Sequence, residues 1–276
     1  MIRFQRDDGN ILKLSDYFKI LSIEGLGMLS QEIFTEKRAV GDGDIVTGTR
    51  LSSRTITITA CNDYAGAFDT SRTKINDYFN PKNKFKIYIT YKQNTVWCEC
   101  FVDTRNLPTD NIYSPQLFVL SVYCPSPYLK SADSFGKNIA GATAMMGFPI
   151  LSDNNKGFAV SRRDFAPKAF IPNNGAVDTY CYAQIRLDEN THGLKIYKNE
   201  NEFILFTVLL YANQLIEIDF ENKKVFIDGV SSPNCIDRRS TFFSIDKGGC
   251  TVSYSSSTSD KDIHIYLYYH QLYLGV

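Results

Sequence analysis

The segment 224-Lys-Val-Phe-Ile-Asp-Gly-229 alternates apolar and polar residues and runs straight into an Asp-Gly turn. Leu215–Phe220 precedes it with the same alternation of apolar and polar residues. Arg239–Asp246, the Lys247–Cys250 turn and Ile263–Tyr269 continue the pattern. Short strands joined by tight polar turns, with no helix-period segment between them, indicate an antiparallel β-sandwich.

The first half of the chain predicts an α+β domain, mostly sheet with one helix laid across it. Ile75, Tyr78 and Phe79 have helical spacing, and the helix is expected to end at Asn80-Pro81. Asp69, Thr70 or Ser71 can cap its start. The expected strands are Ile2–Arg6, Ile11–Leu14, Phe18–Ile23, Arg54–Thr59, Lys84–Tyr91, Thr95–Val102 and Gln116–Cys124.

The best linker candidate is Pro125-Ser126-Pro127, because two prolines stiffen the backbone and stop a strand. We therefore expect one domain over 1–127 and a second over 128–276. Within the second, 134–147 reads as a loop or a short helix, and the chain from Phe148 onward reads as all-β. Ser253–Asp260 is serine-rich and predicts a solvated loop between the last two strands.

The composition describes an ordinary soluble globular protein of 276 residues. Thirty basic residues balance thirty acidic ones, so net charge gives no reason to expect binding to nucleic acid or an anionic membrane. No apolar run approaches the roughly 20 residues that span a bilayer. The N-terminus becomes polar too soon for a signal peptide, so synthesis in the cytosol is expected.

The seven cysteines are expected to act as small buried hydrophobes. Their number is odd, and no pair has the Cys-x-x-Cys spacing of a zinc or redox site. They lie at positions 61, 98, 100, 124, 181, 235 and 250.

Residues for catalysis or metal binding are not brought together by any motif. The three histidines, His192, His264 and His270, have no partner ligands at a suitable spacing, and surface imidazoles are the simpler interpretation. Asp42-Gly-Asp44 begins like a calcium loop but lacks the later oxygen ligands. Asp103 and Asp110 lie in loops that do not fix their separation. The sequence therefore predicts no enzyme, no cofactor and no metal site.

Carbohydrate binding is the main alternative that the residues themselves leave open. A sugar site needs an aromatic ring for the apolar face of the sugar and polar groups for its hydroxyls. The only tryptophan, Trp97, lies in the first half, outside the expected sandwich. Tyr266 and Tyr268 share one face of the last strand and are the candidate ligand platform, although exposed tyrosines are common in sheets.

Several segments, taken in order, give the chain a resemblance to the distal tail proteins of siphophages. In the first half they are Ser22–Gly27, the Gly-Asp-Gly run leading through Thr49-Arg50 to the Arg54 strand, Phe79–Lys82 and Cys124–Pro127. In the second half they are Ile171–Gly175, Ile216–Asp219, Val225–Gly229, Phe242–Gly248 and Tyr273–Gly275. Each motif is structural and weak alone. Gly249-Cys250 departs from the family pattern in a turn only, and Ser126 stands where the family more usually has an acidic residue.

The resemblance implies a scaffold with a tail-tube-like first domain and a galectin-like β-sandwich second domain. Such proteins form a hexameric ring at the tip of the tail, with a lumen that continues the DNA conduit. The implied partners are further copies of the chain, the tail tube protein, the tail-associated tip protein and receptor-binding proteins. The implied location is the distal end of a phage tail, and no sequence-specific nucleic-acid binding is expected.

The glycine-flanked segment 41–48 predicts a loop or a long mobile hairpin. With the resemblance in view, it is a candidate assembly arm that becomes ordered only in the ring. Its marking residues are Gly41, Asp42, Gly43, Asp44 and Gly48. The alternative function is a stand-alone carbohydrate-binding or receptor-adhesion protein that uses the C-terminal sandwich.

Overall fold

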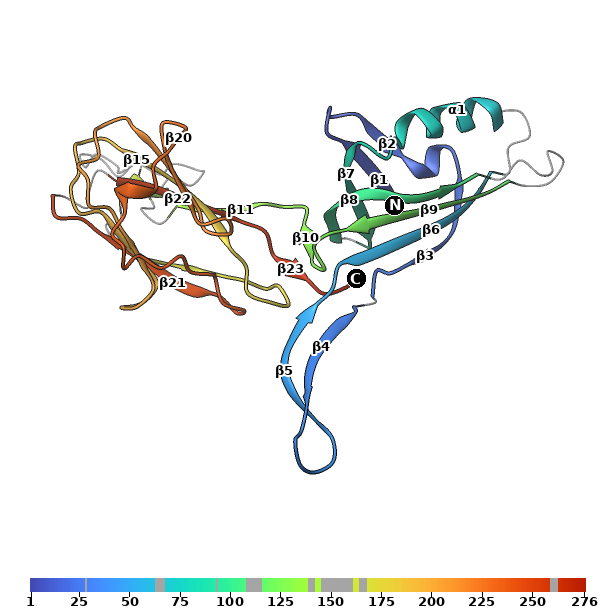
Figure 1. Cartoon of the computed structure of the whole chain (residues 1–276). Coiled ribbons are helices and arrows are strands. Elements are labelled where there is room, and N and C mark those ends of the chain that lie inside the picture. The colour runs from blue at the N-terminus through green and yellow to red at the C-terminus, as the bar shows by residue number, and fades with distance from the viewer. Residues whose placement is uncertain are drawn as a thin grey trace, which may run out of the picture. The chain divides into compact units, whose positions relative to one another are not determined.

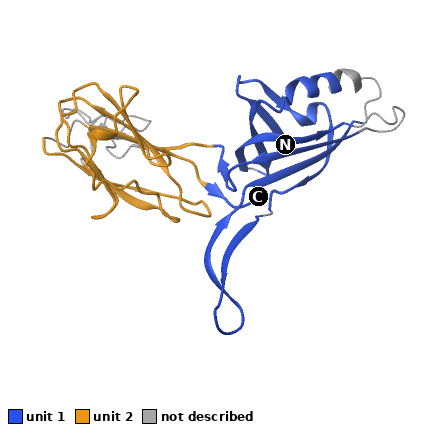
Figure 2. Ribbon diagram, in the orientation of Figure 1, with its two compact units in different colours: residues 1–132, 272–276 blue, residues 133–271 orange. Residues whose placement is uncertain are grey.

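The computed structural model describes residues 1–27, 29–62, 68–92, 94–107, 116–138, 142–144, 161–163, 168–258 and 263–276. It divides into two compact units (Figure 2). Unit 1 holds residues 1–132 together with 272–276, and unit 2 holds residues 133–271. The chain thus crosses from unit 1 to unit 2 and returns for its last five residues. This division differs from the expected 1–127 and 128–276, chiefly because of that return.

Unit 1 is mostly antiparallel sheet with one helix, α1 (Phe68–Tyr78) (Figure 1). Its strands are β1 (Ile2–Arg6), β2 (Ile11–Lys13), β3 (Lys19–Glu24), β4 (Gln31–Lys37), β5 (Asp44–Leu51), β6 (Arg54–Asn62), β7 (Lys84–Tyr91), β8 (Asn94–Asn106), β9 (Gln116–Cys124), β10 (Leu129–Ser131) and β23 (Leu272–Tyr273). A short 3-10 helix, η1, spans Leu14–Asp16. The main sheet runs in the order β2-β1-β7-β8-β9-β6-β3, and β10 pairs with both β8 and β23.

Strand alternation and the period of α1 together build the core of unit 1. In β6, Ile56 and Ile58 are fully buried and Thr55 is exposed. This is the alternation that the sequence predicts. Helix α1 covers this sheet face with Ile75 and, just past its end, Phe79. The rings of Phe4 and Phe79 meet edge to face with centroids 4.9 Å apart. The predicted helix is confirmed, but the side chains of its expected caps lie outside the described residues.

A buried arginine joins three backbone segments of unit 1. The guanidinium of Arg54 donates to the carbonyl oxygens of Pro127 at 3.0 Å, Gly25 at 3.1 Å and Leu26 at 2.5 Å, and also to that of Leu274. Only 3% of Arg54 is exposed, and this burial lowers its pKa from the usual arginine value. The C-terminal segment is therefore held in unit 1 by both β-pairing and a charged donor.

Gly25 gives a first prediction, because its backbone has a φ of +87° and a Cβ there would lie 2.0 Å from the carbonyl oxygen of Thr55. We expect Gly25→Ala to lower the free energy of unfolding of unit 1 by at least ~2 kcal/mol. Gly9→Ala is the matched control, since Gly9 has a φ of +85° but no neighbouring atom within 4 Å. Urea unfolding followed by Trp97 fluorescence measures both, and equal losses would contradict the steric argument.

Where it is described, unit 2 consists of strands and one short 3-10 helix, and two of its sheets share one core (Figure 1). The six-stranded sheet has the order β11 (Phe135–Asn138), β22 (Ile263–Tyr269), β15 (Cys181–Leu187), β18 (Leu215–Asp219), β19 (Lys224–Ile227) and β20 (Val230–Ser231). The four-stranded sheet has the order β14 (Lys168–Ile171), β21 (Cys250–Ser255), β16 (Lys195–Tyr197) and β17 (Phe203–Leu205). A separate pair joins β12 (Ala142–Ala144) to β13 (Ser161–Arg163), and a 3-10 helix, η2, spans Pro233–Cys235.

The core of unit 2 confirms the sandwich expected from the alternation. Ile185 and Leu267 come from the six-stranded sheet, Ile196 and Val252 come from the four-stranded one, and each is at most 1% exposed. Burying one such side chain contributes roughly 1.5–3 kcal/mol. The predicted class, mainly β with one helix in the first half, is therefore confirmed.

Three local predictions for the second half are wrong. Arg239–Asp246 forms no strand, apart from an isolated bridge between Thr179 and Ile245, because its backbone bonds to loops and strand ends instead. Ser253–Ser255 belongs to β21 rather than to a loop, since pairing with β14 and β16 outweighs the turn preference of serine. The segment 134–147 contains β11 and β12, not a helix, where it is described.

Candidate assembly and ligand surfaces

The β4–β5 hairpin extends away from the main sheet of unit 1 as a long two-stranded arm (Figure 1). We call residues 31–51 the arm. Gly41 and Gly43 have φ of +97° and +85° in its tip, Asp42 lies between them, and Asp44 begins β5. Gly48 lies within β5, opposite Phe34. The sequence thus located the tip of a hairpin but missed its length, although the β-branched run after Asp44 was a usable signal.

One face of the arm carries charge. Glu32 and Arg50 face each other across the hairpin with 2.7 Å between the carboxylate Oε2 and the guanidinium Nε. The Arg50 guanidinium also lies 5.7 Å from the ring centre of Phe34. Glu36 and Ile45 follow on the same side by strand alternation. We call this side the charged face.

The opposite face of the arm is uncharged along its middle. The cross-strand pairs there are Ile33 with Thr49 and Thr35 with Val46. Ile33 is 59% exposed and Val46 is 60% exposed. A two-stranded hairpin is at best marginally stable in water without a surface to pack on. The uncharged face therefore has the properties of a contact surface.

A groove of about 570 Å³ lies beside β3, at the edge of the main sheet of unit 1. Within the described residues, β3 pairs only with β6, so its other edge is unpaired. Leu21 and Tyr91 stand on the groove with exposed fractions of 54% and 59%. We call this the β3 groove; it is lined by Met1, Ile2, 20–23, 25–27, 89–91 and Val276.

The two candidate platform tyrosines lie on the outer face of the six-stranded sheet of unit 2. Tyr266 and Tyr268 are each 37% exposed on β22, while their strand neighbours are buried. Tyr268 packs over Gly136 of β11, where a Cβ would lie 3.2 Å from its ring. The structure confirms that both tyrosines share a face, and it holds the Tyr268 ring against the neighbouring strand.

Polar groups on β15 and β18 continue this tyrosine face. Gln184 pairs with Tyr266 in register and donates from Nε2 to the Glu217 carboxylate at 3.3 Å. Tyr182 pairs with Tyr268. Burial raises the pKa of Tyr182 to about 12, and its hydrogen bond with Glu217 acts in the same direction. The Tyr182 hydroxyl therefore stays protonated at neutral pH.

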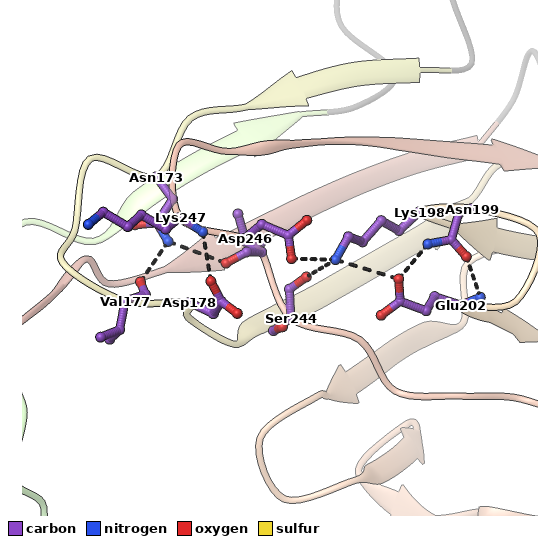
Figure 3. Close-up of polar contacts among 10 residues, drawn as sticks. Asn173, Val177, Asp178, Lys198, Asn199, Glu202, Ser244, Asp246 and Lys247 are labelled. Atoms are coloured by element: carbon purple, nitrogen blue, oxygen red, sulfur yellow. Dashed lines mark hydrogen bonds and ion pairs between the residues drawn. The ribbon is translucent and has the colours of Figure 1, made fainter. Parts of the chain in front are cut away.

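A second polar cluster ties the irregular segment before β21 to the four-stranded sheet (Figure 3). The Lys198 ammonium donates to the Asp246 carboxylate at 2.6 Å and to the Ser244 carbonyl at 3.2 Å, and it lies 3.5 Å from the Glu202 carboxylate. Beside it, Asn173 donates to the Val177 carbonyl at 3.0 Å. These bonds are internal to unit 2, so the cluster fixes a loop rather than forming an open site.

Lys198→Met gives a second prediction, a loss of about 1–2 kcal/mol from the free energy of unfolding of unit 2. Burial lowers the pKa of Lys198, but the bond and charge of Asp246 outweigh it, and the net pKa is raised. A raised pKa stabilises the fold below the ordinary lysine value of about 10.4. The gap between wild type and variant should thus be constant from neutral to mildly alkaline pH and shrink above that value. Thermal unfolding by circular dichroism measures it; no gap at neutral pH would contradict the prediction.

The cysteines and histidines occupy the places expected of structural residues. All seven cysteines are buried. The thiols of Cys98 and Cys124 lie 3.4 Å apart, and this hydrogen bond together with burial raises the pKa of Cys98. His264 approaches the Asp188 carboxylate at 3.1 Å on the surface of unit 2.

The remaining candidate residues from the sequence do not form a metal or catalytic site in the described part of the chain. Among the described residues, no three His, Cys, Asp or Glu side chains are arranged to hold a metal ion. In the same part of the chain, no helix is long and apolar enough to cross a bilayer. Asp103 lies on β8, and Asp110 lies outside the described residues. Trp97 is buried on β8 in unit 1 and donates from its indole nitrogen to the Ser131 carbonyl at 2.9 Å.

Part of the sequence and the whole fold are similar to those of phage tail proteins. Residues 174–273 match the family model of the siphovirus-type tail component, C-terminal domain. A search of curated proteins found no match. The resemblance to siphophage distal tail proteins is therefore confirmed by sequence over residues 174–273, and the solved structures extend it to the fold of the whole chain.

Among solved structures, the chain is similar to the Dit protein (gp 19.1) of phage SPP1, described as a paradigm of the hub adsorption apparatus in phages that infect Gram-positive hosts. The TM-score is 0.72 at 11% identity, and the match covers 99% of each chain. Chains of the phage P2 baseplate in its activated conformation also match, with TM-scores of 0.50 with Ca and 0.51 with Sr. Both are 10% identical and cover 97% of this chain and 98% of the other.

Proposed function

We propose that this protein is the distal hub of a phage tail. Six copies form a ring that connects the tail tube to the tip apparatus and lets DNA pass through its lumen. The protein acts by self-association and docking, without catalysis, cofactor or sequence-specific binding to DNA. Its partners are further copies of the chain, the tail tube protein, the tail-associated tip protein and receptor-binding proteins. Its place is the distal end of the tail in the virion.

The observation that carries the proposal is a full-length agreement in fold with the phage SPP1 hub protein, covering 99% of both chains. The family match over residues 174–273 supports it independently of the first half. The arm adds a physical reason, because Ile33 and Val46 expose apolar surface that only an assembly would bury. The candidate assembly residues Gly41, Asp42, Gly43, Asp44 and Gly48 fall within this arm.

Electron microscopy of the particles that contain the protein tests its location. Antibodies against the purified chain, coupled to gold, should label the distal end of the tail. Labelling along the tail tube or on the head would overturn the proposed hub. Particles from a strain that lacks the gene are the control for specificity, and they should also lack a complete tail tip.

A second candidate function is carbohydrate binding by unit 2, which the tyrosine face favours. Tyr266 and Tyr268 present rings for the apolar face of a sugar, and the Gln184–Glu217 pair presents polar groups for its hydroxyls. Wild type and Tyr268→Ala should then differ in retention on cell-wall polysaccharide. Equal retention, or none for either, excludes this alternative and leaves the hub proposal untouched.

A further inference from the structure

We propose that the uncharged face of the arm of one copy packs into the β3 groove of the next copy. This inference rests on the proposed ring and names the two surfaces that make its repeating contact. The contact is made of backbone edge and apolar side chains, and the occupant of the groove is a second copy of this chain.

The arm supplies one half of the contact. Its uncharged face shows Ile33, Thr35, Val46 and Thr49, whereas the other face holds the Glu32–Arg50 ion pair. Charged groups are costly to bury, and β-branched groups are favourable. The face that enters an interface is therefore the one with Ile33 and Val46.

The β3 groove supplies the other half. Most of its lining residues are apolar: Ile20, Ile23 and Ile89 belong to or pack against the core of unit 1, and Leu21 and Tyr91 are exposed. The outer edge of β3 has no paired strand within the described residues, and such edges recruit a further strand or are covered. The uncharged face of the arm supplies apolar side chains for the lining, and the outer edges of β4 and β5, which pair only with each other in the described residues, supply backbone groups for the edge of β3.

The geometry points to a neighbour rather than to the same chain. Only six residues, 25–30, join β3 to β4, and the arm extends away from the sheet (Figure 1). No residue of the arm lines the groove of its own copy. Each copy offers one arm and one groove, which are different surfaces. A contact between different surfaces is heterologous, and such contacts repeat from copy to copy until a ring closes. The copies in the ring would therefore be arranged head to tail, with the arm of each in the groove of the next.

Paired cysteines test the contact in the full-length protein. All native cysteines are buried, so surface cysteines are selective reporters. We expect Leu21→Cys with Val46→Cys to give a ladder of covalent oligomers on mild oxidation, ending at the closed ring. Mixing the two single variants should give only covalent dimers, which proves that the link is between copies. Leu21→Cys with Ile45→Cys is the matched control, because Ile45 lies on the charged face.

The cross-linking yields test the contact between arm and groove, and the oligomeric state of the wild-type chain tests the ring. The Val46 pair should give at least ~10-fold more product than the Ile45 pair, because an interface holds its residues at high effective concentration. If the chain forms rings but the two cysteine pairs give equal amounts of product, the proposed contact between arm and groove is wrong and the proposed hub function is unaffected. A wild-type chain that forms no ring in scattering and microscopy overturns the proposed function, and this inference with it.

Discussion

The Arg54→Ala variant is expected to lose about 4 kcal/mol of the free energy of unfolding of unit 1. Its guanidinium donates to four carbonyl oxygens from three segments, and the substitution removes this donor from all four. Leu274 and Pro127 would be released together, so the C-terminal segment should also exchange its amide hydrogens faster. Chemical unfolding followed by Trp97 fluorescence gives the energy.

Arg54→Lys is the control that keeps the positive charge but removes the planar guanidinium and its spread of donors. A lysine has three donors at one point and cannot reach all four oxygens, so it should recover only part of the loss. An alanine variant within ~1 kcal/mol of wild type would show that water replaces the guanidinium, contradicting the structural role given to it.

Replacing both Ile33 and Val46 by Asp should abolish ring formation while leaving the unfolding of the isolated chain unchanged. Each side chain contributes roughly 1.5–3 kcal/mol when buried, so losing two weakens each contact by roughly 10³-fold, and buried carboxylates weaken it further. Both residues are more than half exposed in the single copy, so its own stability does not depend on them. Sedimentation velocity measures the oligomer, and thermal unfolding measures the fold.

The matched control changes Phe34 and Ile45 to Asp on the charged face. Phe34 and Ile45 are 47% and 49% exposed, close to the values of the tested pair. The control should keep the ring, because that face stays in water in the proposed contact. Loss of the ring in both variants would mean that the arm acts through its overall stability, and rings in both would mean that the arm makes no contact.

Local pattern carried most of the fold prediction. Ile216 and Ile218 alternate with polar residues and form β18, and the Asp228-Gly229 turn ends β19 where it was expected. The spacing of Ile75 and Phe79 predicted helix α1. These patterns depend only on residues close together in the sequence, so they can be recognised without knowledge of the tertiary structure.

The errors have a common physical origin in non-local contacts. Phe243 and Ile245 are buried as in a strand, yet the surrounding backbone bonds to Phe203 and Thr179 and stays irregular. Tyr273 pairs with Leu129, which places the C-terminus in unit 1, and no local pattern encodes that pairing. The structure of such segments is determined by their tertiary contacts and not by the β-propensity of their residues.

The candidate surfaces were only partly predictable. The glycines around Asp42 marked the tip of the arm, and the alternation of β22 placed Tyr266 and Tyr268 on one face. The β3 groove left no motif, because it is formed by residues far apart in the chain, such as Ile20 and Ile89. Contact surfaces of this kind depend on shape, which one sequence does not display.

The oligomeric state of the purified full-length chain tests whether the protein is a hub. Light scattering after size exclusion over a concentration series, with negative-stain images of the large species, gives both mass and symmetry. A distal hub is expected to form six-fold rings with an open lumen. A chain that remains monomeric across the whole series, with no rings in the images, would contradict it.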